Sequence, residues 1–395
     1  MNILIISAVF TPEPIVSAKL SEDIAINLSQ SNKVTVISPN PTRPFGFRFL
    51  KKVKNKSFSL IHLDSFTCPK YNFFGRLREN YSFGNACKKY IEKNKNNIDI
   101  IYMNSWPIFA QYITVNTAYK FNIPIVTHIQ DVYPESISTK IPSLRYLFNL
   151  LLRPIDKIIL KRSKNVIAVS EKMKKYLASS RHISLNKIKV VQNWQDEDRF
   201  INFEKTKKSN SIEKKLFTFM YMGNIGPVAG LDLLIESFYK ANLKSCRLLI
   251  AGSGSKRIEL KNLVSSRKIK RINFIDVPDG KVPEIQGLSD VMILPIKKGA
   301  ASSSIPSKLP AYMFSKKPII ASVDIDSASA KIINEAKSGW VIEPENIDML
   351  TILMREAYST EKSELELKGE NGFAFAMENL SKKNNLKQLV KAILE

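Results

Sequence analysis

Short apolar segments alternate with longer amphipathic segments along almost the whole chain. Each apolar segment has the length of one buried strand, and the segments between them repeat their apolar positions with the period of a helix. This alternation predicts an α/β architecture in which parallel sheets are covered by helices on both faces. In the first half we expect strands at residues 3–7, 33–38, 60–62, 98–103, 124–128, 165–168 and 188–191, with helices that include 17–30, 74–93 and 170–179.

The alternation stops once and then begins again. From residue 201 to about residue 215 the chain is rich in Lys, Ser and Asn and has no periodicity, which is typical of a linker. Beyond it we expect strands at 217–222, 247–251, 272–275, 291–295, 318–321 and 339–342, with helices at 231–240, 257–265 and 309–314.

These patterns predict two doubly wound, Rossmann-like domains. We expect an N-terminal domain over residues 1–198, a C-terminal domain over 199–375, and a final helix within 376–395 that packs back toward the N-terminal domain. Two such domains joined by a linker predict a central cleft, because ligands of doubly wound sheets bind beyond the carboxyl ends of the strands.

Composition narrows the class of protein. A hydrophobic content of 44% with 24% charged residues is typical of a globular protein. No apolar run approaches the roughly 18–20 residues that cross a bilayer, and residues 1–10 resemble a buried strand more than a signal peptide. The three cysteines and three histidines are widely separated, so we expect a reducing compartment and no protein-bound metal or cofactor.

Positive charge is concentrated in the first half. Residues 1–195 hold 29 Lys and Arg against 11 Asp and Glu, net +18, whereas residues 196–395 hold 31 against 25, net +6. A coding bias toward lysine would spread the excess evenly. The asymmetry favours a polyanionic partner at the first half, such as a phospholipid surface, a diphosphate lipid or nucleic acid.

Residues 299–321, GAASSSIPSKLPAYMFSKKPIIA, carry the clearest chemical signal. A loop of small residues leads to Pro306, Ser307 and Lys308, where a helix is expected to begin. Unpaired backbone amides and the positive end of the helix dipole favour an anion there, so the segment predicts a diphosphate site. A lysine is unfavourable at this end of a helix unless an anion is bound, which supports the same hypothesis. The alternative is an ordinary loop whose serines cap a helix.

Three more loops follow expected strands on the same edge of the second sheet. Residues 223–226 and 252–255 are rich in glycine, and residues 276–278 follow the next strand. Single glycine turns are common, but convergent loops on one sheet edge favour a nucleotide.

These segments, in this order, resemble the retaining glycosyltransferases of family 4, which have the GT-B fold. The resemblance rests on YMGNIGPVAGLDLLIESF, LLIAGSGSKRIEL, INFIDVPDGKVPEIQGLSDVMILPI, the serine loop and SGWVIEPEN in the second half. In the first half it rests on FTPEPIVSAKLSEDIAINLSQSNKVTVIS, HIQDVYPES and VVQNW. The last two resemble a branch that makes bacterial surface polysaccharides, including fucosamine-type and colanic-acid transferases.

The resemblance implies a nucleotide-sugar donor in the C-terminal domain and an acceptor in the N-terminal domain. The implied donor-binding residues are Gly223, Asn224, Gly226, Gly252, Gly254, Val277, Ser304, Ile305, Pro306, Ser307 and Lys308. The implied acceptor or interdomain residues are Ser17, Lys19 and Asn193.

The chain departs from the wider family at charged positions. Ser303 and Ala311 stand where the family has two glutamates, the second of which binds ribose. Asn224 and Ala229 stand where it has an Arg and a Lys, so Lys308 is expected to supply charge to the diphosphate. Residues 16–18 replace glycines usual in this branch, which weakens the prediction of a phosphate contact at the first loop.

Sugar transfer also requires a group that accepts the proton of the acceptor hydroxyl. Directly after an expected strand, HIQDVYPES offers His128, Asp131 and Glu135. Asp131 is the preferred base. Its alternative role is to cap the N-terminus of a short helix. His128 is the second candidate for the base, because a histidine at the end of a strand is more often packed in the core. Glu135 could be a base or a surface charge. No residue is a convincing covalent nucleophile, so retention implies departure and attack on the same face of the sugar.

Residues 142–163, PSLRYLFNLLLRPIDKIILKRS, are predicted to form two amphipathic pieces split at Pro154. Their apolar residues, with Phe148, Leu151 and Leu152 facing lipid, and their basic residues fit a membrane interface. Residues 43–56 add aromatics among positive charges. The alternative is that both segments cover the core of the first domain.

We therefore expect a retaining enzyme that moves a sugar from a UDP-sugar or another nucleotide sugar to a polyprenyl-diphosphate-linked saccharide in capsule or O-antigen biosynthesis. It would act at the anionic inner face of the cell membrane, in the cytoplasm, without metal or other cofactor. A non-hydrolysing nucleotide-sugar epimerase shares this architecture and is the alternative. A nucleic-acid binder is disfavoured because no helix-turn-helix, RNA-binding aromatic motif or basic tail is present.

Overall fold

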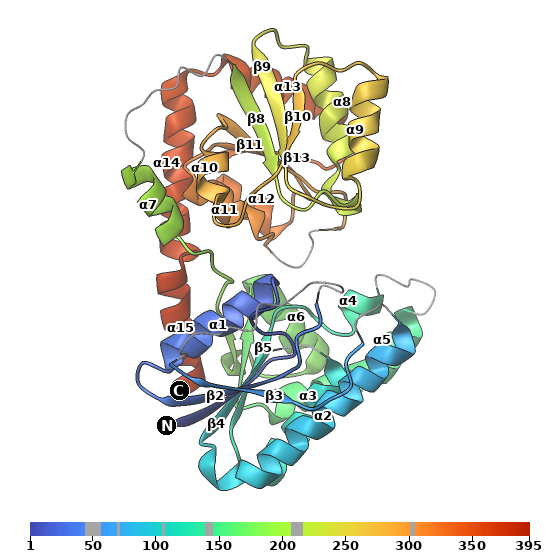
Figure 1. The fold of residues 1–395 in the computed structure, drawn as a ribbon, viewed down its shortest axis with the longest axis vertical. Helices are drawn as coiled ribbons and strands as arrows, with labels where there is room; N and C mark the ends of the chain where they lie inside the picture. The colour runs from blue at the N-terminus through green and yellow to red at the C-terminus, as the bar shows by residue number, and fades with distance from the viewer. Residues whose placement is uncertain (44–56, 69–71, 105–106, 139–144, 207–215, 301–304) are drawn as a thin grey trace. The chain divides into compact units, whose positions relative to one another are not determined.

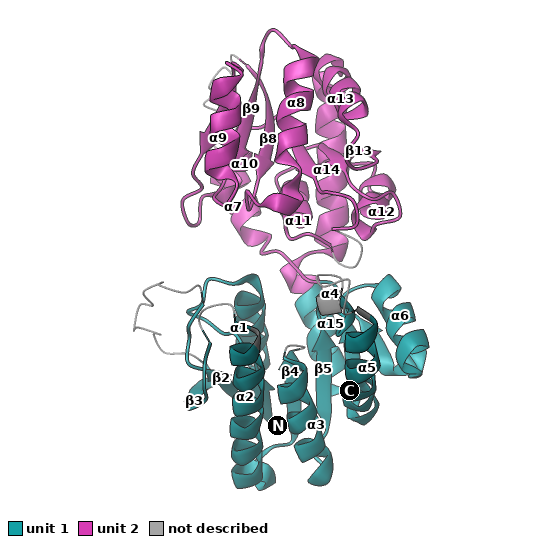
Figure 2. Cartoon of the chain, turned by 90° about the vertical axis from the view of Figure 1, so that its right-hand side faces the viewer, with its two compact units in different colours: residues 1–192, 385–395 teal, residues 193–384 magenta. Residues whose placement is uncertain are grey.

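The computed structural model describes residues 1–395 except 44–56, 69–71, 105–106, 139–144, 207–215 and 301–304 (Figure 1). The chain divides into two compact units, each built on a parallel sheet (Figure 2). Unit 1 comprises residues 1–192 and 385–395, and unit 2 comprises residues 193–384. The expected α/β class with two parallel sheets is confirmed.

Unit 1 contains a seven-stranded sheet in the order β3-β2-β1-β4-β5-β6-β7. Its inner strands are mainly apolar because both faces are covered, as parallel sheets require, whereas the edge strand β3 is largely exposed. In register, Ile3 of β1 lies opposite Val34 of β2 and Ile100 of β4. The strands are β1 (Asn2–Ile6), β2 (Lys33–Pro39), β3 (Ser59–Leu63), β4 (Ile100–Asn104), β5 (Ile125–Ile129), β6 (Asn165–Ala168) and β7 (Ile188–Val190).

Helices lie on both faces of this sheet. Apolar residues of α2, α3, α5 and α6 form one core cluster with one face of the strands. On the other face, the amide of Asn165 at the start of β6 donates to the carbonyl of Ala392 in α15 at 3.2 Å. The helices are α1 (Val16–Leu28), α2 (Phe73–Asn94), η1 (Lys95–Asn97), α3 (Ile108–Lys120), α4 (Glu135–Ser138), α5 (Arg145–Arg162), α6 (Glu171–Arg181), η3 (Leu185–Lys187) and, at the end of the chain, α15 (Lys382–Leu394).

Unit 2 contains a six-stranded sheet in the order β10-β9-β8-β11-β12-β13. One core cluster joins it to α8, α9 and α13, and another joins its opposite face to α11, α12 and α14. The strands are β8 (Phe217–Met222), β9 (Cys246–Ala251), β10 (Ile272–Ile275), β11 (Val291–Pro295), β12 (Ile319–Ser322) and β13 (Gly339–Ile342). The helices are α7 (Asp198–Thr206), η4 (Pro227–Ala229), α8 (Leu231–Ala241), α9 (Arg257–Ser266), α10 (Val282–Gln286), α11 (Lys308–Phe314), α12 (Ala328–Glu335), α13 (Ile347–Ser359) and α14 (Lys362–Asn379).

The helix α5 contradicts the predicted division at Pro154. It runs unbroken from Arg145 to Arg162 with Pro154 inside. Proline removes one backbone donor, which is normally disruptive. Here Pro154 lies on the exposed side, so the carbonyl that loses its partner can be solvated, while Ile159 and Leu160 anchor the opposite side in the core.

Part of the segment expected to be a linker is helical. Helix α7 extends to Thr206 because Phe200 inserts into the core of unit 2 with 2% exposure. Residues 207–215, the remainder of that segment, lie outside the described part of the chain.

Candidate active site

Two glycine loops lie at the carboxyl edge of the sheet in unit 2. Gly223 follows β8 and Gly252 follows β9, with positive φ angles of 153° and 128°. A Cβ atom on Gly252 would lie 2.2 Å from the carbonyl oxygen of Gly223, and one on Gly254 would lie 2.3 Å from that of Ile225. Glycine is therefore required where the two loop backbones approach each other, independently of any ligand.

Lys308, the first residue of α11, lies against the first of these loops. A Cβ atom on Gly223 would lie 2.2 Å from its Cε atom, and its Nζ atom is 5.0 Å from the centre of the Tyr221 ring. Burial lowers the pKa of Lys308. No carboxylate pairs with it among the described residues, so an ammonium group stands at the carboxyl end of β8 without a neutralising charge.

The neighbouring predicted donor residues have different environments. Ser307 is exposed and its side chain makes no capping hydrogen bond, so this serine does not cap α11. Ile305, Pro306 and Val277 are half-buried, whereas Asn224 is exposed and Gly226 is buried. Ser304 and Ser303 lie outside the described residues, and Ala311 is buried in α11.

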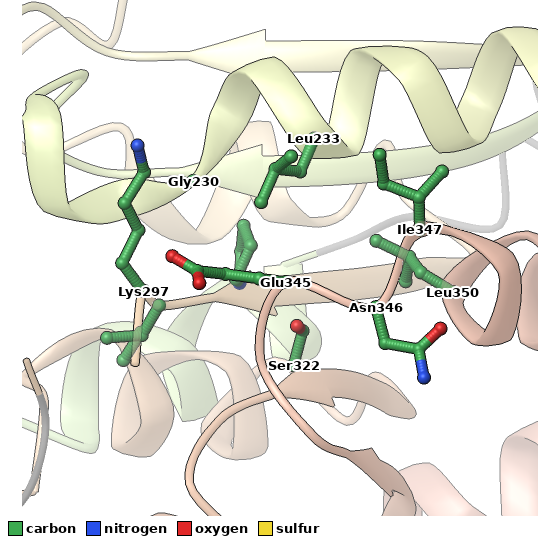
Figure 3. Close-up of a pocket in the computed structure, with 10 residues that line it drawn as sticks. Gly230, Leu233, Lys297, Ser322, Glu345, Asn346, Ile347 and Leu350 are labelled. Carbon is green, nitrogen blue, oxygen red and sulfur yellow. The ribbon is translucent and has the colours of Figure 1, made fainter. Parts of the chain in front are cut away.

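Unit 2 also contains a small pocket that Lys308 does not line. Its lining comes from the start of α8, the ends of β11 and β12, and the loop leading into α13. The side chain of Glu345 extends across it beside Lys297 (Figure 3). None of the predicted donor residues lines this pocket, and a carboxylate within it disfavours a phosphate.

The three candidates after β5 have separate environments. Asp131 is exposed, and no hydrogen bond or ion pair reaches it from the described residues. His128 is 1% exposed inside β5. Glu135 accepts hydrogen bonds from Arg181 at 2.7 Å, Tyr176 at 2.7 Å and Arg153 at 3.0 Å. Asp131 is thus the acid of this segment that is available to a substrate.

Glu135 belongs to a buried ion-pair network. Burial alone would raise its pKa, but the hydrogen bonds from Arg181 and Tyr176 hold the pKa of Glu135 below its ordinary value. The Arg181 side chain is fully buried and also donates from Nε to Asp156 at 2.7 Å. Burial raises the pKa of Asp156 to about 6, against the opposing effect of Arg181.

A chain of hydrogen bonds leads away from His128. Its Nδ1 atom is 2.7 Å from the hydroxyl of Tyr102, which donates to Oδ1 of Asn104 at 2.9 Å. The amide of Asn104 donates to Ser21 at 2.6 Å and Ser7 at 3.4 Å. Burial lowers the pKa of His128 to about 4, so its ring is neutral at pH 7.

The predicted acceptor residues are dispersed. Ser17 is half-buried near the start of α1, and Lys19 is paired with Glu22 at 3.2 Å and Asp23 at 3.7 Å. Asn193 opens unit 2, and its side-chain oxygen is buried without a hydrogen-bond partner in the described part of the chain. Ser17 and Lys19 thus belong to unit 1 and Asn193 to unit 2, and their role in acceptor binding stays a prediction.

Two protein-family models match the chain in succession. "Glycosyltransferase Family 4" matches residues 21–199, and "Glycosyl transferases group 1" matches residues 202–371. Their junction falls near the boundary between the two units. The chain belongs to these glycosyltransferase families.

Two curated proteins that resemble this chain in sequence are also named as glycosyltransferases. WbjE of Pseudomonas aeruginosa is 21% identical over 266 residues, which cover 62% of this chain and 63% of the relative. The colanic acid biosynthesis glycosyl transferase WcaI of Escherichia coli is 22% identical over 238 residues, which cover 58% of this chain and 56% of the relative. The matches therefore span less than two thirds of either relative.

Solved structures share the fold over nearly their full length. A glycosyltransferase from Rickettsia africae matches with a TM-score of 0.71 and 18% identity, covering 99% of this chain and 97% of that one. Anabaena HepE in complex with UDP matches with a TM-score of 0.69 and 14% identity, covering 100% of both. These similarities confirm the GT-B fold of this glycosyltransferase family member.

The sequence did not predict the polar residues that hydrogen-bond to His128 and Glu135. Arg181 lies two residues beyond the predicted end of its helix, and nothing in the pattern shows that it is buried. A weak signal existed for Asn104, a polar residue that directly follows the apolar run of β4. Its partners Ser7 and Ser21 come from distant parts of the chain, so spacing could not reveal them.

The described residues contain neither a membrane-spanning helix nor a cluster of metal-binding side chains. None of the helices there is long and apolar enough to cross a membrane. No cluster of three or more His, Cys, Asp or Glu side chains capable of holding a metal ion occurs in the same part of the chain.

Proposed function

We propose that this protein is a retaining glycosyltransferase that moves a sugar from a nucleoside-diphosphate sugar to a lipid-diphosphate-linked saccharide in surface-polysaccharide biosynthesis. The observation that carries the proposal is the half-buried ammonium of Lys308, which has no carboxylate partner among the described residues. A desolvated cation is unfavourable unless an anion binds it. The diphosphate of a nucleotide sugar supplies such an anion.

The comparisons support a nucleotide-sugar donor and a role in polysaccharide biosynthesis. Structures of HepE contain UDP, UDP with glucose, or UDP-glucose. WcaI is named for colanic acid biosynthesis, and WaaG, another solved structure with a TM-score of 0.67, for lipopolysaccharide biosynthesis. Surface polysaccharides of this kind motivate the assignment of a lipid-linked acceptor.

In the proposed mechanism, Lys308 neutralises charge that develops on the diphosphate as the glycosidic bond breaks. Asp131 accepts the proton of the attacking hydroxyl, which then bonds to the anomeric carbon on the face that the diphosphate leaves. The products are the glycosylated acceptor and a nucleoside diphosphate. No metal is assigned a role in this scheme.

The proposal is tested with the full chain and a panel of UDP-, GDP- and dTDP-sugars. Mass spectrometry identifies the donor that the protein retains, and that donor is then incubated with polyprenyl-diphosphate-linked saccharides. A longer lipid-linked saccharide with the anomeric configuration of the donor supports the proposal. Release of an epimerised nucleotide sugar without acceptor would instead identify an epimerase.

Lys308→Ala is expected to weaken binding of UDP, or of the diphosphate that the panel identifies, by about 1.5–3 kcal/mol. This is the range for one hydrogen bond to a charged group. Isothermal titration calorimetry measures the loss. Lys331→Ala, on the exposed surface of α12 in the same unit, is the matched control and should bind normally. Equal affinity in both variants would remove Lys308 from the donor site.

We further propose that α5 attaches the protein to the inner face of the cell membrane. Its first turns expose Tyr146 by 80%, Leu150 and Leu151 by 58% each, and Leu147 by 49%. Its last turn carries Lys161 and Arg162. Phe148 and Leu152 were predicted to face lipid, but both are half-buried and Leu152 packs against the core. The exposed apolar residues of α5 therefore differ from the predicted lipid-facing residues, which share only Leu151 with them.

The triple substitution of Leu147, Leu150 and Leu151 by serine should reduce binding to vesicles that contain anionic lipid. Electrostatic attraction contributes about 1 kcal/mol per basic residue near such a surface and is screened by salt. The variant should therefore lose mainly the binding that survives high salt, as measured by sedimentation. Ile26→Ser with Tyr81→Ser, exposed positions on α1 and α2, is the control. Wild-type protein that ignores these vesicles at low salt would refute membrane attachment.

A further inference from the structure

A chain of polar side chains runs through the carboxyl end of the mainly apolar sheet in unit 1. It links Ser7 after β1, Ser21 of α1, Asn104 at the end of β4, and Tyr102 and His128 in the sheet. Ser7 and His128 are 1% exposed, and Ser21 and Tyr102 are 0% exposed. Water is excluded from most of this chain, so each hydrogen in it needs an acceptor within the protein.

The two serines fix the orientation of Asn104. The hydroxyl of Ser7 donates to the carbonyl of Val9 at 2.6 Å, and that of Ser21 donates to the carbonyl of Ser17 at 2.8 Å. Each hydroxyl has a single hydrogen, so both oxygens can only accept from Asn104. The amide nitrogen of Asn104 therefore faces the serines, and its Oδ1 atom faces Tyr102.

Asn104 in turn fixes the protonation of His128. The single hydroxyl hydrogen of Tyr102 is directed to Oδ1 of Asn104, so the tyrosine oxygen accepts from Nδ1 of His128. A neutral imidazole carries one N–H, so Nε2 retains a lone pair. This Nε2 atom is buried and has no hydrogen-bond partner among the described residues.

We propose that Ser7, Ser21, Asn104 and Tyr102 are positioning residues that hold His128 in its Nδ1–H tautomer, so that Nε2 accepts a hydrogen bond from a hydroxyl of the sugar substrate. The sugar in this statement rests on the proposed function, whereas the tautomer rests on the hydrogen-bond chain alone. A buried acceptor without a partner is unfavourable, and a sugar hydroxyl supplies the missing donor. Binding sites of this type discriminate strongly against analogues that lack the hydroxyl.

The tautomer is measured by NMR on the full chain labelled with ¹⁵N in its histidine rings. Only His62, His128 and His182 contribute signals, and His128→Gln assigns the one of interest. At pH 7 the wild-type protein should show an N–H-type nitrogen at Nδ1 and a lone-pair nitrogen at Nε2. The opposite pattern in the wild-type protein would overturn the proposal.

Two substitutions at Asn104 separate positioning from simple structural support. Asn104→Leu removes the acceptor of the Tyr102 hydrogen, which is then free to donate to Nδ1, so the tautomer should invert. Asn104→Asp keeps an oxygen toward Tyr102, and a serine hydroxyl can turn to its other oxygen, so the Nδ1–H form should persist. The same tautomer in both variants would contradict the mechanism. If Asn104→Leu fails to fold, Tyr102→Phe replaces it and should lose the Nδ1–H preference.

Activity provides a second and separate measurement. With the nucleotide sugar identified by the panel, transfer should fall in Asn104→Leu and survive in Asn104→Asp. If no nucleotide sugar is used, the proposed function fails while the tautomer result stands. If transfer occurs but both variants retain wild-type rates, the role of Nε2 in binding the sugar is refuted.

Discussion

Replacing Asp131 by asparagine is expected to reduce sugar transfer by about 10²–10⁴-fold, the usual contribution of a general base. Asp131 follows the end of β5 by two residues, is exposed, and receives no hydrogen bond or ion pair from the described part of the chain. Asparagine preserves the shape of the side chain but cannot take up a proton at neutral pH. The loss should therefore appear in kcat, while nucleotide binding stays within a few-fold of wild type.

The measurement compares single-turnover rates with calorimetric donor affinity. Asp64→Asn is the matched control, since Asp64 is also exposed and directly follows a strand, β3, of the same sheet. It should transfer sugar at the wild-type rate. Wild-type turnover in Asp131→Asn would exclude this residue as the base and leave Nε2 of His128 as the next candidate.

The positions of the strands could be predicted from the sequence because buried parallel strands form short apolar runs between helical patterns. Residues 165–168, 217–222, 272–275, 291–295 and 339–342 were predicted with the bounds that the structure has. The error at Pro154 has a specific cause. Proline is a local signal for a break, whereas the apolar contacts that keep α5 intact are tertiary.

The candidate site was less predictable for the same reason. Asp131 and Glu135 are four residues apart and chemically alike, yet Glu135 is held by Arg153 and Arg181, which lie 18 and 46 residues further along the chain. Gly252 and Gly254 were assigned to donor binding, but their immediate physical requirement is the close approach of two loops. Contacts between distant segments decide both cases, and no local pattern encodes them.

Replacing Arg181 by methionine is expected to destabilise unit 1 by about 3–5 kcal/mol, the range for removing one partner of a buried ion pair. Methionine fills similar volume but leaves the carboxylates of Glu135 and Asp156 without their buried cation. Arg153→Met is the matched control, because Arg153 contacts the same Glu135 with 41% of its side chain exposed. An exposed pair contributes about 0–1 kcal/mol. Urea unfolding followed by circular dichroism measures both variants.

The pH dependence of the Arg181→Met defect provides an internal check. In the wild-type protein, burial already raises the pKa of Asp156 from 3.8 to about 6, and loss of the cation should raise it further. A carboxyl with a raised pKa in the folded state binds its proton more tightly when folded than when unfolded. Its stabilising effect is complete below its ordinary pKa and is lost as the pH rises through the folded-state pKa. The variant should therefore be closer to wild type at pH 5 than at pH 8. A defect equal to that of Arg153→Met, or one that is independent of pH, would show that Arg181 does not hold these carboxylates together.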